Sequence, residues 1–429
     1  MTLLWMFTAL VGLVLLNVPI AVALGVVAVG AMLMTSGVAM LPNVALVLFD
    51  GTTRFPLIAI PLFILAGAIM NASGISRRLV AFASALLGFV RGGLAMVAIG
   101  ASLFFAEISG SAVADVAALG SILIPAMQRK GYSREFAAAV TSSSATLAVI
   151  IPPSIPMILY AVMSGSSVIE LFVAGIVPGL IGGVLMMGIA YAMAIRHDFP
   201  VEEAFELRRL RDAFRDAMWA LSLPAIILGG IFSGFVTATE GAGLAVVAAI
   251  LIGGLIYREL DWGQLRRAML EGGVQTAVVM LLVGASALLG TFLTQAQVPQ
   301  QLAAGITGLT DNPWTVLLLL NVLFLAIGLF LHSAAAIILV VPIVMPLVHA
   351  VGIDPVHFGL VVTLNLGIGQ QTPPVASVLV TACSVAKADI WEVSKVNVVF
   401  VAALLATLLL VTYVPAVPLS LVRLLFGPA

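Results

Sequence analysis

The segment ATLAVIIPPSIP, from Ala145 to Pro156, places a Pro-Pro pair inside an apolar stretch that otherwise has the character of a helix. A second segment, LGIGQQTPPVAS from Leu366 to Ser377, repeats this arrangement. A proline inside a helix removes a hydrogen-bond donor and clashes with the preceding turn, so each helix must break and leave backbone carbonyls without partners. Lipid forbids such a break unless it lines a cavity inside the protein. Two breaks at corresponding positions in two halves of a chain therefore predict a transporter's binding site near the middle of the membrane.

The composition is that of an integral membrane protein. Of the 429 residues, 62% are hydrophobic and only 9% are charged, whereas soluble domains carry roughly 25% charged residues. The single cysteine, Cys383, excludes an internal disulfide and a cysteine-based metal site. The net charge of -1, with no basic stripe, predicts no nucleic-acid partner. The apolar N-terminus lacks the positive region of a signal peptide, so we expect it to be retained as a first membrane segment.

The two halves of the chain are related by an internal repeat. Pro152 and Pro373 are 221 positions apart (373 − 152), and Gly131 and Gly352 are also 221 positions apart (352 − 131). This constant offset ties a hairpin, a turn and a broken helix together in each half. The tip of the first hairpin is the SGS sequence at 109–111, and the second hairpin bends near residues 331–333.

The distribution of basic residues orients the repeats. Lys and Arg gather on cytoplasmic loops, and the clusters at 91–134, 196–215 and 258–267 fall on one side if each hairpin is re-entrant. The stretches 298–313 and 349–355 contain no Lys or Arg and fall on the other side. The first hairpin therefore enters from the cytoplasm and the second from outside, which makes the repeat inverted. The first 36 residues form either two short spans, with an external N-terminus, or one tilted helix, with an internal one.

Five regions follow from the repeat. The scaffold is predicted to comprise 1–92, with an arm helix, and 167–297, with a cytoplasmic linker at 196–217. The two halves of the transport domain are 93–166 and 298–390, and the C-terminal span is 391–429. In the second scaffold part, we expect a basic arm around Arg266 and then a separate span that begins at Gly272. The stretch 298–313 is predicted to be an external loop.

Each half contributes a hairpin tip and a helix break to the predicted site. Carbonyls and helix C-termini suit Na⁺, whereas helix N-termini and hydroxyls suit a carboxylate. The candidate substrate ligands are hydroxyl, imidazole and amide groups: Ser111, Thr146, Ser154, His332, Ser333 and Gln370. Because these groups are neutral, we favour Na⁺ over H⁺ as the coupling ion. Asp115, on the same helix face as Ser111, keeps a proton-driven alternative open.

Parts of this pattern also have structural interpretations. Ser and Gly in membrane helices commonly serve close helix packing. Glu240 follows a threonine at a helix N-terminus, where its charge is stabilising, and His332 has a structural role as an alternative to substrate contact. The sequence contains no HExxH or GxSxG motif, so we do not expect an intramembrane enzyme.

Several long motifs resemble the large membrane subunit, of the DctM type, of tripartite ATP-independent periplasmic (TRAP) transporters. They are FPLIAIPLFILAGAIMNASGISRRLV (55–80), RGGLAMV (91–97), ISGSAVADVAALGSILIPAM (108–127), IIPPSIPMILYA (150–161), FVTATEGAG (235–243) and NLGIGQQTPPV (365–375). The resemblance covers nearly the whole chain. It implies an all-α, inverted-repeat, elevator-type transporter of the bacterial inner membrane, in which two re-entrant hairpins and two broken helices slide as a transport domain against a scaffold.

The resemblance also implies partners and a function. Such subunits are Na⁺-driven importers of organic anions such as C4-dicarboxylates, sialic acids or 2-oxo acids, which a periplasmic substrate-binding protein delivers. A small four-helix membrane subunit enlarges the scaffold, and because this chain begins at its own first span, we expect that partner to be a separate chain. No cofactor is implied besides the coupling Na⁺. The alternatives are a stand-alone Na⁺- or H⁺-coupled carboxylate carrier of the wider ion-transporter superfamily, and a purely structural membrane protein.

The resemblance assigns two Na⁺ sites by position. The first comprises Ser109, Ala112, Ala148, Ile151 and Pro153, and the second comprises Gly328, Gly369, Thr372 and Val375. Two segments depart from the family pattern: the first break reads ATLA where Gly is common at its ends, and the second tip reads LHSAA where an acidic residue followed by two Thr is common. The first change leaves backbone carbonyls in place, whereas the second bears on the tip ligands and the substrate class.

Overall fold

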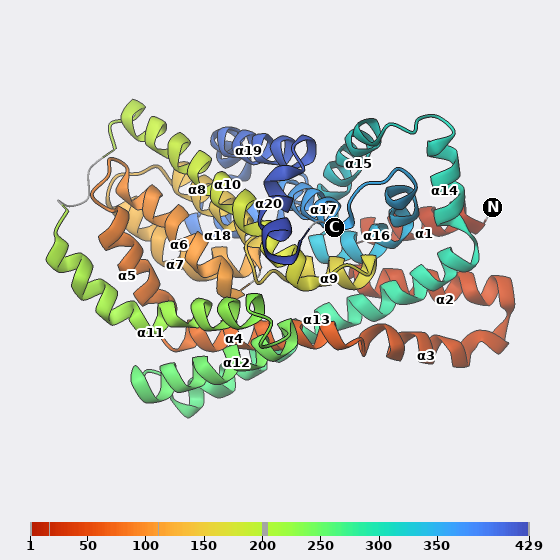
Figure 1. Cartoon of the computed structure of the whole chain (residues 1–429), viewed down its shortest axis with the longest axis horizontal. Coiled ribbons are helices and arrows are strands. Elements are labelled where there is room, and N and C mark those ends of the chain that lie inside the picture. Colours follow the sequence, from red (N-terminus) through yellow and green to blue (C-terminus); the bar gives the residue numbers. More distant parts are fainter. Residues whose placement is uncertain (1, 17, 110, 200–204, 428–429) are drawn as a thin grey trace.

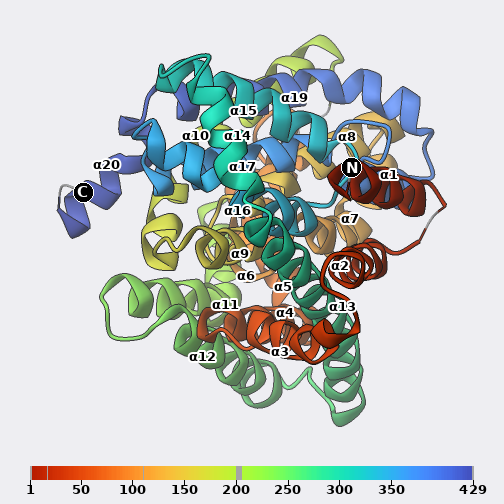
Figure 2. The ribbon, with the colours of Figure 1, turned by 90° about the vertical axis from the view of Figure 1, so that its right-hand side faces the viewer.

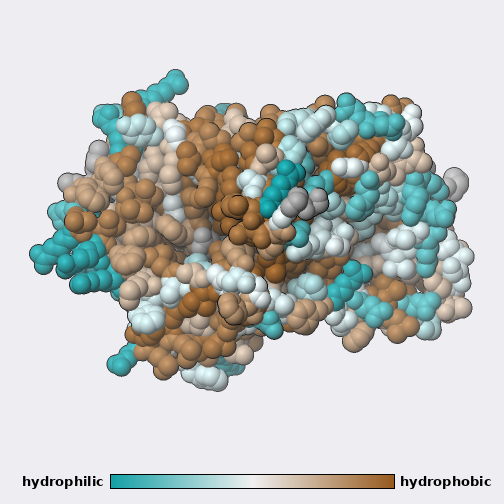
Figure 3. Space-filling view, viewed as in Figure 1, coloured by the Kyte–Doolittle hydropathy of each residue, from teal (hydrophilic) through white to brown (hydrophobic). Residues whose placement is uncertain are grey.

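The computed structural model describes residues 2–16, 18–109, 111–199 and 205–427, and these segments contain helices and no strand. Among them, eight helices are long and apolar enough to cross a membrane, by length and composition. Hydrophobic residues dominate the middle of the face drawn in Figure 3, whereas hydrophilic residues gather toward the two ends of the long axis. The predicted all-α membrane fold is confirmed.

The first half of the chain forms ten helices in the described segments. They are α1 (Thr2–Leu15), α2 (Ile20–Ser36), α3 (Leu41–Thr52), α4 (Ala59–Ala72), α5 (Ile75–Leu87), α6 (Gly93–Ser109), α7 (Ala112–Arg129), α8 (Arg134–Thr146), α9 (Ile155–Ser164) and α10 (Val168–Arg196). The second half forms α11 (Leu207–Phe232), α12 (Ala238–Leu251), α13 (Trp262–Gln295), α14 (Val298–Thr307), α15 (Pro313–Gly328), α16 (Ser333–Ala350), α17 (Pro355–Gly369), α18 (Ser377–Ala386), α19 (Ile390–Tyr413) and α20 (Ala416–Phe426). Short helical turns are η1 (Val38–Met40), η2 (Phe55–Ile58), η3 (Leu147–Val149) and η4 (Ile252–Ile256).

The order of helices repeats at one offset. Helices α7 and α16 begin 221 residues apart (333 − 112) and end 221 residues apart (350 − 129), and α8 and α17 also begin 221 residues apart (355 − 134). The repeat extends beyond the hairpins, because α13 corresponds to positions 41–74 of the first half (262 − 221 = 41 and 295 − 221 = 74), where α3, η2 and α4 span 41–72. The repeat predicted from the proline and glycine spacing is confirmed.

Two hairpins and two broken helices form one layer of the molecule. Hairpin α6–α7 packs against α8, and hairpin α15–α16 packs against α17. The second segment of each broken helix crosses to the hairpin of the other half, so α9 packs against α16 and α18 packs against α7. Figure 1 shows the two hairpins at opposite ends of the long axis, as an inverted repeat requires. Helices α10 and α19 pack onto the same layer, against α6 and α8 respectively.

The remaining long helices form a second layer. Helix α13 packs along α2, α3 and α4, and α12 packs against α4 and α11. In Figure 2, α3, α4, α11 and α12 lie below, and α15, α17 and α19 lie above. The layers meet where α13 contacts α16 and where α4 contacts α6 and α9. The second layer therefore lies directly beside the hairpins and the broken helices.

Some predictions about individual helices were wrong. The stretch 298–313, predicted to be a loop, contains α14, which has Pro299 in its first turn, where the missing N–H of a proline is not needed. The predicted boundary at Gly272 does not exist, because α13 continues from Trp262 to Gln295. Gly272 lies inside this helix, where it faces Leu65 of α4: a Cβ added to it would stand 3.5 Å from the Leu65 Cα. At the N-terminus the prediction from the repeat holds: α1 and α2 are two helices that pack against each other, and the alternative of one tilted helix is wrong.

Candidate functional site

The two hairpin tips have the same construction. Ser111 is the N-cap of α7, and its Oγ accepts a hydrogen bond from the Ala114 N–H at 3.5 Å. His332 stands 221 positions later (332 − 111) and is the N-cap of α16, where its Nδ1 accepts a hydrogen bond from the Ala334 N–H at 3.4 Å. Because a backbone N–H can only donate, a neutral His332 in this contact carries its proton on Nε2. Each tip therefore starts an 18-residue helix whose N-terminal end attracts negative charge.

The second helix break is built on a contact between two glycines. Helix α15 ends at Gly328 and α17 ends at Gly369, and a Cβ added to Gly369 would stand 2.5 Å from the Gly328 Cα. Beyond this crossing, Thr372 Oγ1 donates to the carbonyl four residues earlier at 3.1 Å. The Val375 N–H donates to the Leu329 carbonyl at 3.3 Å. The structure therefore brings the predicted residues of the second Na⁺ site together around one backbone crossing.

The first helix break is held by side-chain caps and by the backbone of α10. Ser154 is the N-cap of α9, and its Oγ donates to the Val149 carbonyl at 2.7 Å and accepts from the Met157 N–H at 3.4 Å. A Cβ added to Gly175 of α10 would stand 1.9 Å from the Ile150 carbonyl oxygen, so only glycine fits there. The peptide bonds Pro152–Pro153 and Pro373–Pro374 are both cis.

The predicted residues of the first Na⁺ site lie around this break. Ala112, Ala148, Ile151 and Pro153 are buried. Both α6 and α7 contact η3, which brings the helix of Ala112 against the turn of Ala148. Ser109 ends α6, but its side chain lies outside the described part of the chain, as does Gly110 at the tip.

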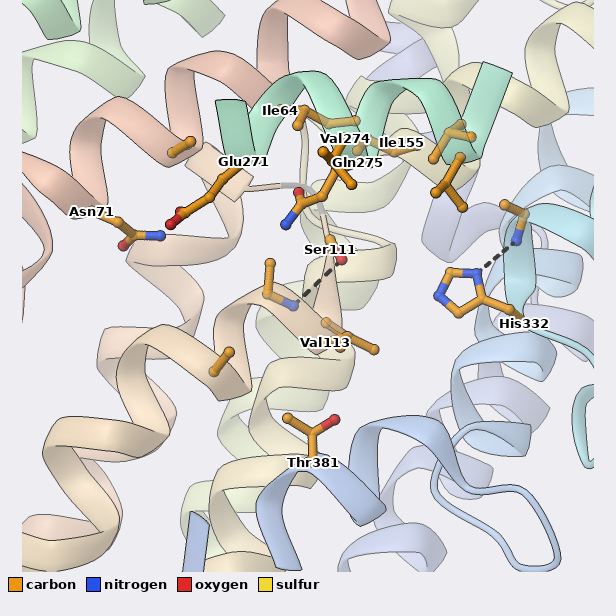
Figure 4. Close-up of a pocket in the computed structure, with 18 of the residues that line it drawn as sticks. Ile64, Asn71, Ser111, Val113, Ile155, Glu271, Val274, Gln275, His332 and Thr381 are labelled. Atoms are coloured by element: carbon orange, nitrogen blue, oxygen red, sulfur yellow. Dashed lines mark hydrogen bonds between the residues drawn. The ribbon is translucent and has the colours of Figure 1, made fainter. Parts of the chain in front are cut away.

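A cavity of about 940 Å³ lies between the two layers. Its polar residues on the hairpin layer are Ser111, His332, Ser333, Gln370, Ser377 and Thr381, and those on the second layer are Asn71, Gln264, Arg267, Glu271 and Gln275. In Figure 4, Glu271 and Gln275 reach into the cavity from α13, while Ser111, His332 and Thr381 lie on the opposite side. The hairpin wall thus presents neutral groups, and the α13 wall carries the charged side chains.

Four of the six predicted substrate ligands line this cavity: Ser111, His332, Ser333 and Gln370. Thr146 and Ser154 do not line it. Both are buried, and their hydroxyls donate to carbonyls of the chain, Thr146 to Ser142 at 3.1 Å. On the hairpin layer, the cavity is therefore lined by both tips and by the N-terminal ends of α9 and α18.

Sequence reasoning missed the wall formed by α13. Gln264, Arg267, Glu271 and Gln275 recur every three or four residues, so they share one face of the helix. This periodicity is visible in the sequence, but the basic residues nearby were interpreted only as a cytoplasmic arm. The division of 262–295 into an arm and a span hid the continuous polar face.

A family model described as "Tripartite ATP-independent periplasmic transporter, DctM component" matches residues 7–417. The chain belongs to the DctM family. It is 42% identical, over 94% of its length, to the isethionate TRAP transporter permease protein DctMQ of Oleidesulfovibrio alaskensis. It is 39% identical to the C4-dicarboxylate TRAP transporter large permease protein DctM of Pseudomonas aeruginosa, over 88% of this chain and 89% of that one.

Longer relatives also match this DctM chain. It is 36% identical, over 85% of its length, to the sialic acid TRAP transporter permease protein SiaT of Haemophilus influenzae. The alignments span 59% of SiaT and 64% of the isethionate protein, so this chain covers under two thirds of each. The YdaH transporter of Alcanivorax borkumensis shares the fold, with a TM-score of 0.59 over 89% of each chain at 15% identity.

The family and the structure together define the class of this protein. The family model describes a transporter component, and the related chains are transporter permease proteins, not enzymes. The DctM chain is therefore a multi-pass permease of the inner membrane, and its eight candidate spans, within the described residues, agree with that location.

Proposed function

We propose that this DctM chain is the large permease subunit of a secondary active importer that uses a Na⁺ gradient to take up an organic anion. One observation carries the proposal: both hairpin tips and both helix breaks converge on one cavity between two layers. Discontinuous helices that meet in this way place helix ends and backbone groups where a substrate and a coupling ion bind.

The substrate class follows from the donors on the hairpin wall. Ser111 offers a hydroxyl, His332 offers the Nε2 proton, and two helix N-termini add a positive potential. The relatives are named for isethionate, C4-dicarboxylates and sialic acid, which all carry a carboxylate or a sulfonate. We therefore propose a small organic acid, and the cavity volume lies within the range of ligand sites, roughly 300 to 1,000 Å³.

Na⁺ is the proposed coupling ion because the breaks offer neutral oxygens. The first Na⁺ would lie among Ser109, Ala112, Ala148, Ile151 and Pro153, and the second among Gly328, Gly369, Thr372 and Val375. Asp115, the residue that a proton-driven alternative would use, is buried in α7 and does not line the cavity.

The two layers support an elevator-type movement. We propose that the regions 93–166 and 298–390 move together, and that α10 and α19 travel with them because both helices pack onto the hairpin layer. The helices on the other side of the cavity, α2 to α4 and α11 to α13, would form the scaffold. Contacts between the layers include the apolar crossings of α13 with α16 and one long-range hydrogen bond, from Arg54 Nη1 to the Val162 carbonyl at 3.2 Å.

The partners are also part of the proposal. A small membrane subunit would widen the scaffold, and a periplasmic binding protein would deliver the substrate from outside. The apolar side chains exposed on the scaffold, such as Phe49, Trp219 and Val247, suit either lipid or such a subunit.

The test is uptake into proteoliposomes that contain this chain and its small partner, with labelled carboxylates and sulfonates. Accumulation that requires both an inward Na⁺ gradient and the binding protein is the expected result. Uptake driven equally well by a proton gradient in Na⁺-free buffer would overturn the ion assignment. Uptake that needs no binding protein would identify a stand-alone carrier instead.

A further inference from the structure

The side chain of Gln371 connects the two helix breaks. It follows Gln370 directly at the second break, yet its Nε2 donates to the Ser142 carbonyl at 2.7 Å and to the Thr146 Oγ1 of the first break. Thr146 Oγ1 in turn donates to the same Ser142 carbonyl at 3.1 Å. Three groups therefore close a small ring of hydrogen bonds that spans both halves of the repeat.

A second amide fixes the orientation of Gln371. Asn397 of α19 donates from Nδ2 to Gln371 Oε1 at 3.2 Å, and its Oδ1 accepts from Ser143 Oγ at 2.6 Å. The donors and acceptors follow one direction, from Ser143 through Asn397 and Gln371 to Thr146. Because every amide has one consistent assignment, the Gln371 side chain is held in a single orientation.

The connection is buried and tightly packed. Gln371, Asn397 and Thr146 are each 1% exposed. The α17 backbone also packs closely on side chains of the first break, because a Cβ added to Gly367 would stand 3.0 Å from Thr146 Cγ2. In this low-dielectric setting a hydrogen bond is strong, and removal of one partner leaves the other unsatisfied at high cost. A shift of one break therefore cannot leave the other break unchanged.

The proposed ion ligands adjoin this connection. Ala148 follows Thr146 by two residues, and Thr372 follows Gln371 directly. We infer that Gln371 couples the two Na⁺ sites, so that an ion bound at one break orders the other break and raises its affinity. This inference rests on the proposed Na⁺-driven function and adds a positioning residue to it. Gln371 acts through the breaks and does not line the cavity that holds the substrate.

The test replaces Gln371 with a side chain of similar size that forms no hydrogen bond. In the complex with the small subunit, we expect wild-type uptake to rise with Na⁺ at a Hill coefficient of about two, and Gln371→Met to lower it to about one while raising half-saturating Na⁺ about tenfold. The Na⁺-dependent shift of the thermal unfolding midpoint, measured at constant ionic strength with choline, gives the same comparison without transport.

A matched control separates coupling from general loosening of the fold. Asn365 donates to Asn321 Oδ1 at 2.6 Å, and Asn321 donates to Thr412 Oγ1 at 3.2 Å, which forms a buried amide chain of the same kind between α15, α17 and α19. It does not touch the first break. Asn321→Ser is expected to lower the unfolding temperature and to leave the Na⁺ Hill coefficient unchanged.

A second variant keeps the inference testable if Gln371→Met does not fold. Thr146→Val removes the receiving hydroxyl from the first break and is expected to lower the Hill coefficient in the same way, and the double variant should be no worse than either single one. Folded variants that retain the wild-type Hill coefficient would overturn the coupling role alone. Wild-type uptake that does not respond to Na⁺ would overturn the Na⁺-driven function, and the coupling with it, before any variant is compared.

Discussion

The hairpin layer and the scaffold layer use the same repeat differently. In the hairpin layer the helices of the two halves match closely, so that α7 and α16 begin and end at one offset. In the scaffold, one continuous helix, α13, corresponds to two helices, α3 and α4, which Thr53, Arg54 and the turn η2 separate. The backbone is thus symmetric where two ion sites are proposed and asymmetric where the cavity needs one continuous polar wall.

The side chains of the hairpin layer are less symmetric than its backbone. Ser111 corresponds to His332 at the tips, and Ala148 corresponds to Gly369 at the breaks (369 − 148 = 221). The first half therefore contributes mainly backbone groups and small side chains. The second half contributes the His332 imidazole at its tip and the Gln371 amide, which reaches the first break. Substitutions that give a residue in one half the side chain of its counterpart in the other half test how far the roles of the two halves differ.

The largest effect is expected from Gly369→Ala. Its Cβ would stand 2.5 Å from the Gly328 Cα, and overpacking of this kind costs about 3 kcal/mol of stability. The reverse exchange at the corresponding position, Ala148→Gly, costs about 1 kcal/mol because it only frees the backbone. Thermal unfolding and uptake are the measurements, with uptake abolished in the first variant and retained in the second. Equal stabilities for the two variants would show that the glycine crossing does not fix the second break.

The next effect is expected at the tips. His332→Ser makes the second tip resemble the first and removes the Nε2 donor, which should raise the KM of uptake about tenfold, as expected for one lost hydrogen bond to an anion. His349→Ser is the control, because His349 is exposed at the far end of α16. A KM that stays at the wild-type value in His332→Ser would assign His332 a capping role only.

Only part of the fold and of the site could be predicted from the sequence. Pro-Pro pairs and turn glycines act locally, so the hairpins, the breaks and the repeat were predictable. The continuity of α13 was readable from the spacing of Gln264, Arg267, Glu271 and Gln275, whereas helix α14 depends on packing against the distant helix α16, which no local pattern records. The reach of Gln371 into the first break was hidden for the same reason, although both breaks had been recognised.

A smaller effect is expected on the scaffold wall. Arg267 lines the cavity and its neighbour Arg266 does not. Arg267→Gln should raise KM about threefold at low salt and less at high salt, because salt screens the attraction between an exposed charge and an anion. Arg266→Gln is the matched control and should change little. The same KM for both variants, at every salt concentration, would contradict a role of the α13 wall in anion entry or release.

The smallest effect is expected at α5, which α14 matches in the second half at nearly the same offset (298 − 75 = 223 and 307 − 87 = 220). Helix α5 carries Arg78, whose Nη2 donates to Glu259 Oε1 at 2.7 Å, and this hydrogen bond lowers the pKa of Glu259. Because the pKa is lower in the folded state than in the unfolded one, the pair stabilises the fold at neutral pH and loses that contribution as pH falls through the folded pKa. Glu259→Gln should cost about 0.5 kcal/mol at neutral pH.

The control for this last prediction lies just after α14, the helix that matches α5 in the second half. Asp311→Asn removes a carboxylate near α14 and should leave the unfolding temperature unchanged. The difference between wild type and Glu259→Gln should shrink as the pH falls below the ordinary Glu value of about 4.3. A difference that stays constant across that range would contradict an ionic contribution from Glu259.

The most direct test of the central claim is simultaneous measurement of two fluxes. Radioactive Na⁺ and a labelled organic acid would be followed in the same proteoliposomes, which contain this chain and its small partner and are supplied with the loaded binding protein. The account predicts that Na⁺ enters together with the acid, in a fixed ratio above one, and that both fluxes stop when either solute is withheld. Entry of the acid without any accompanying Na⁺ would contradict it.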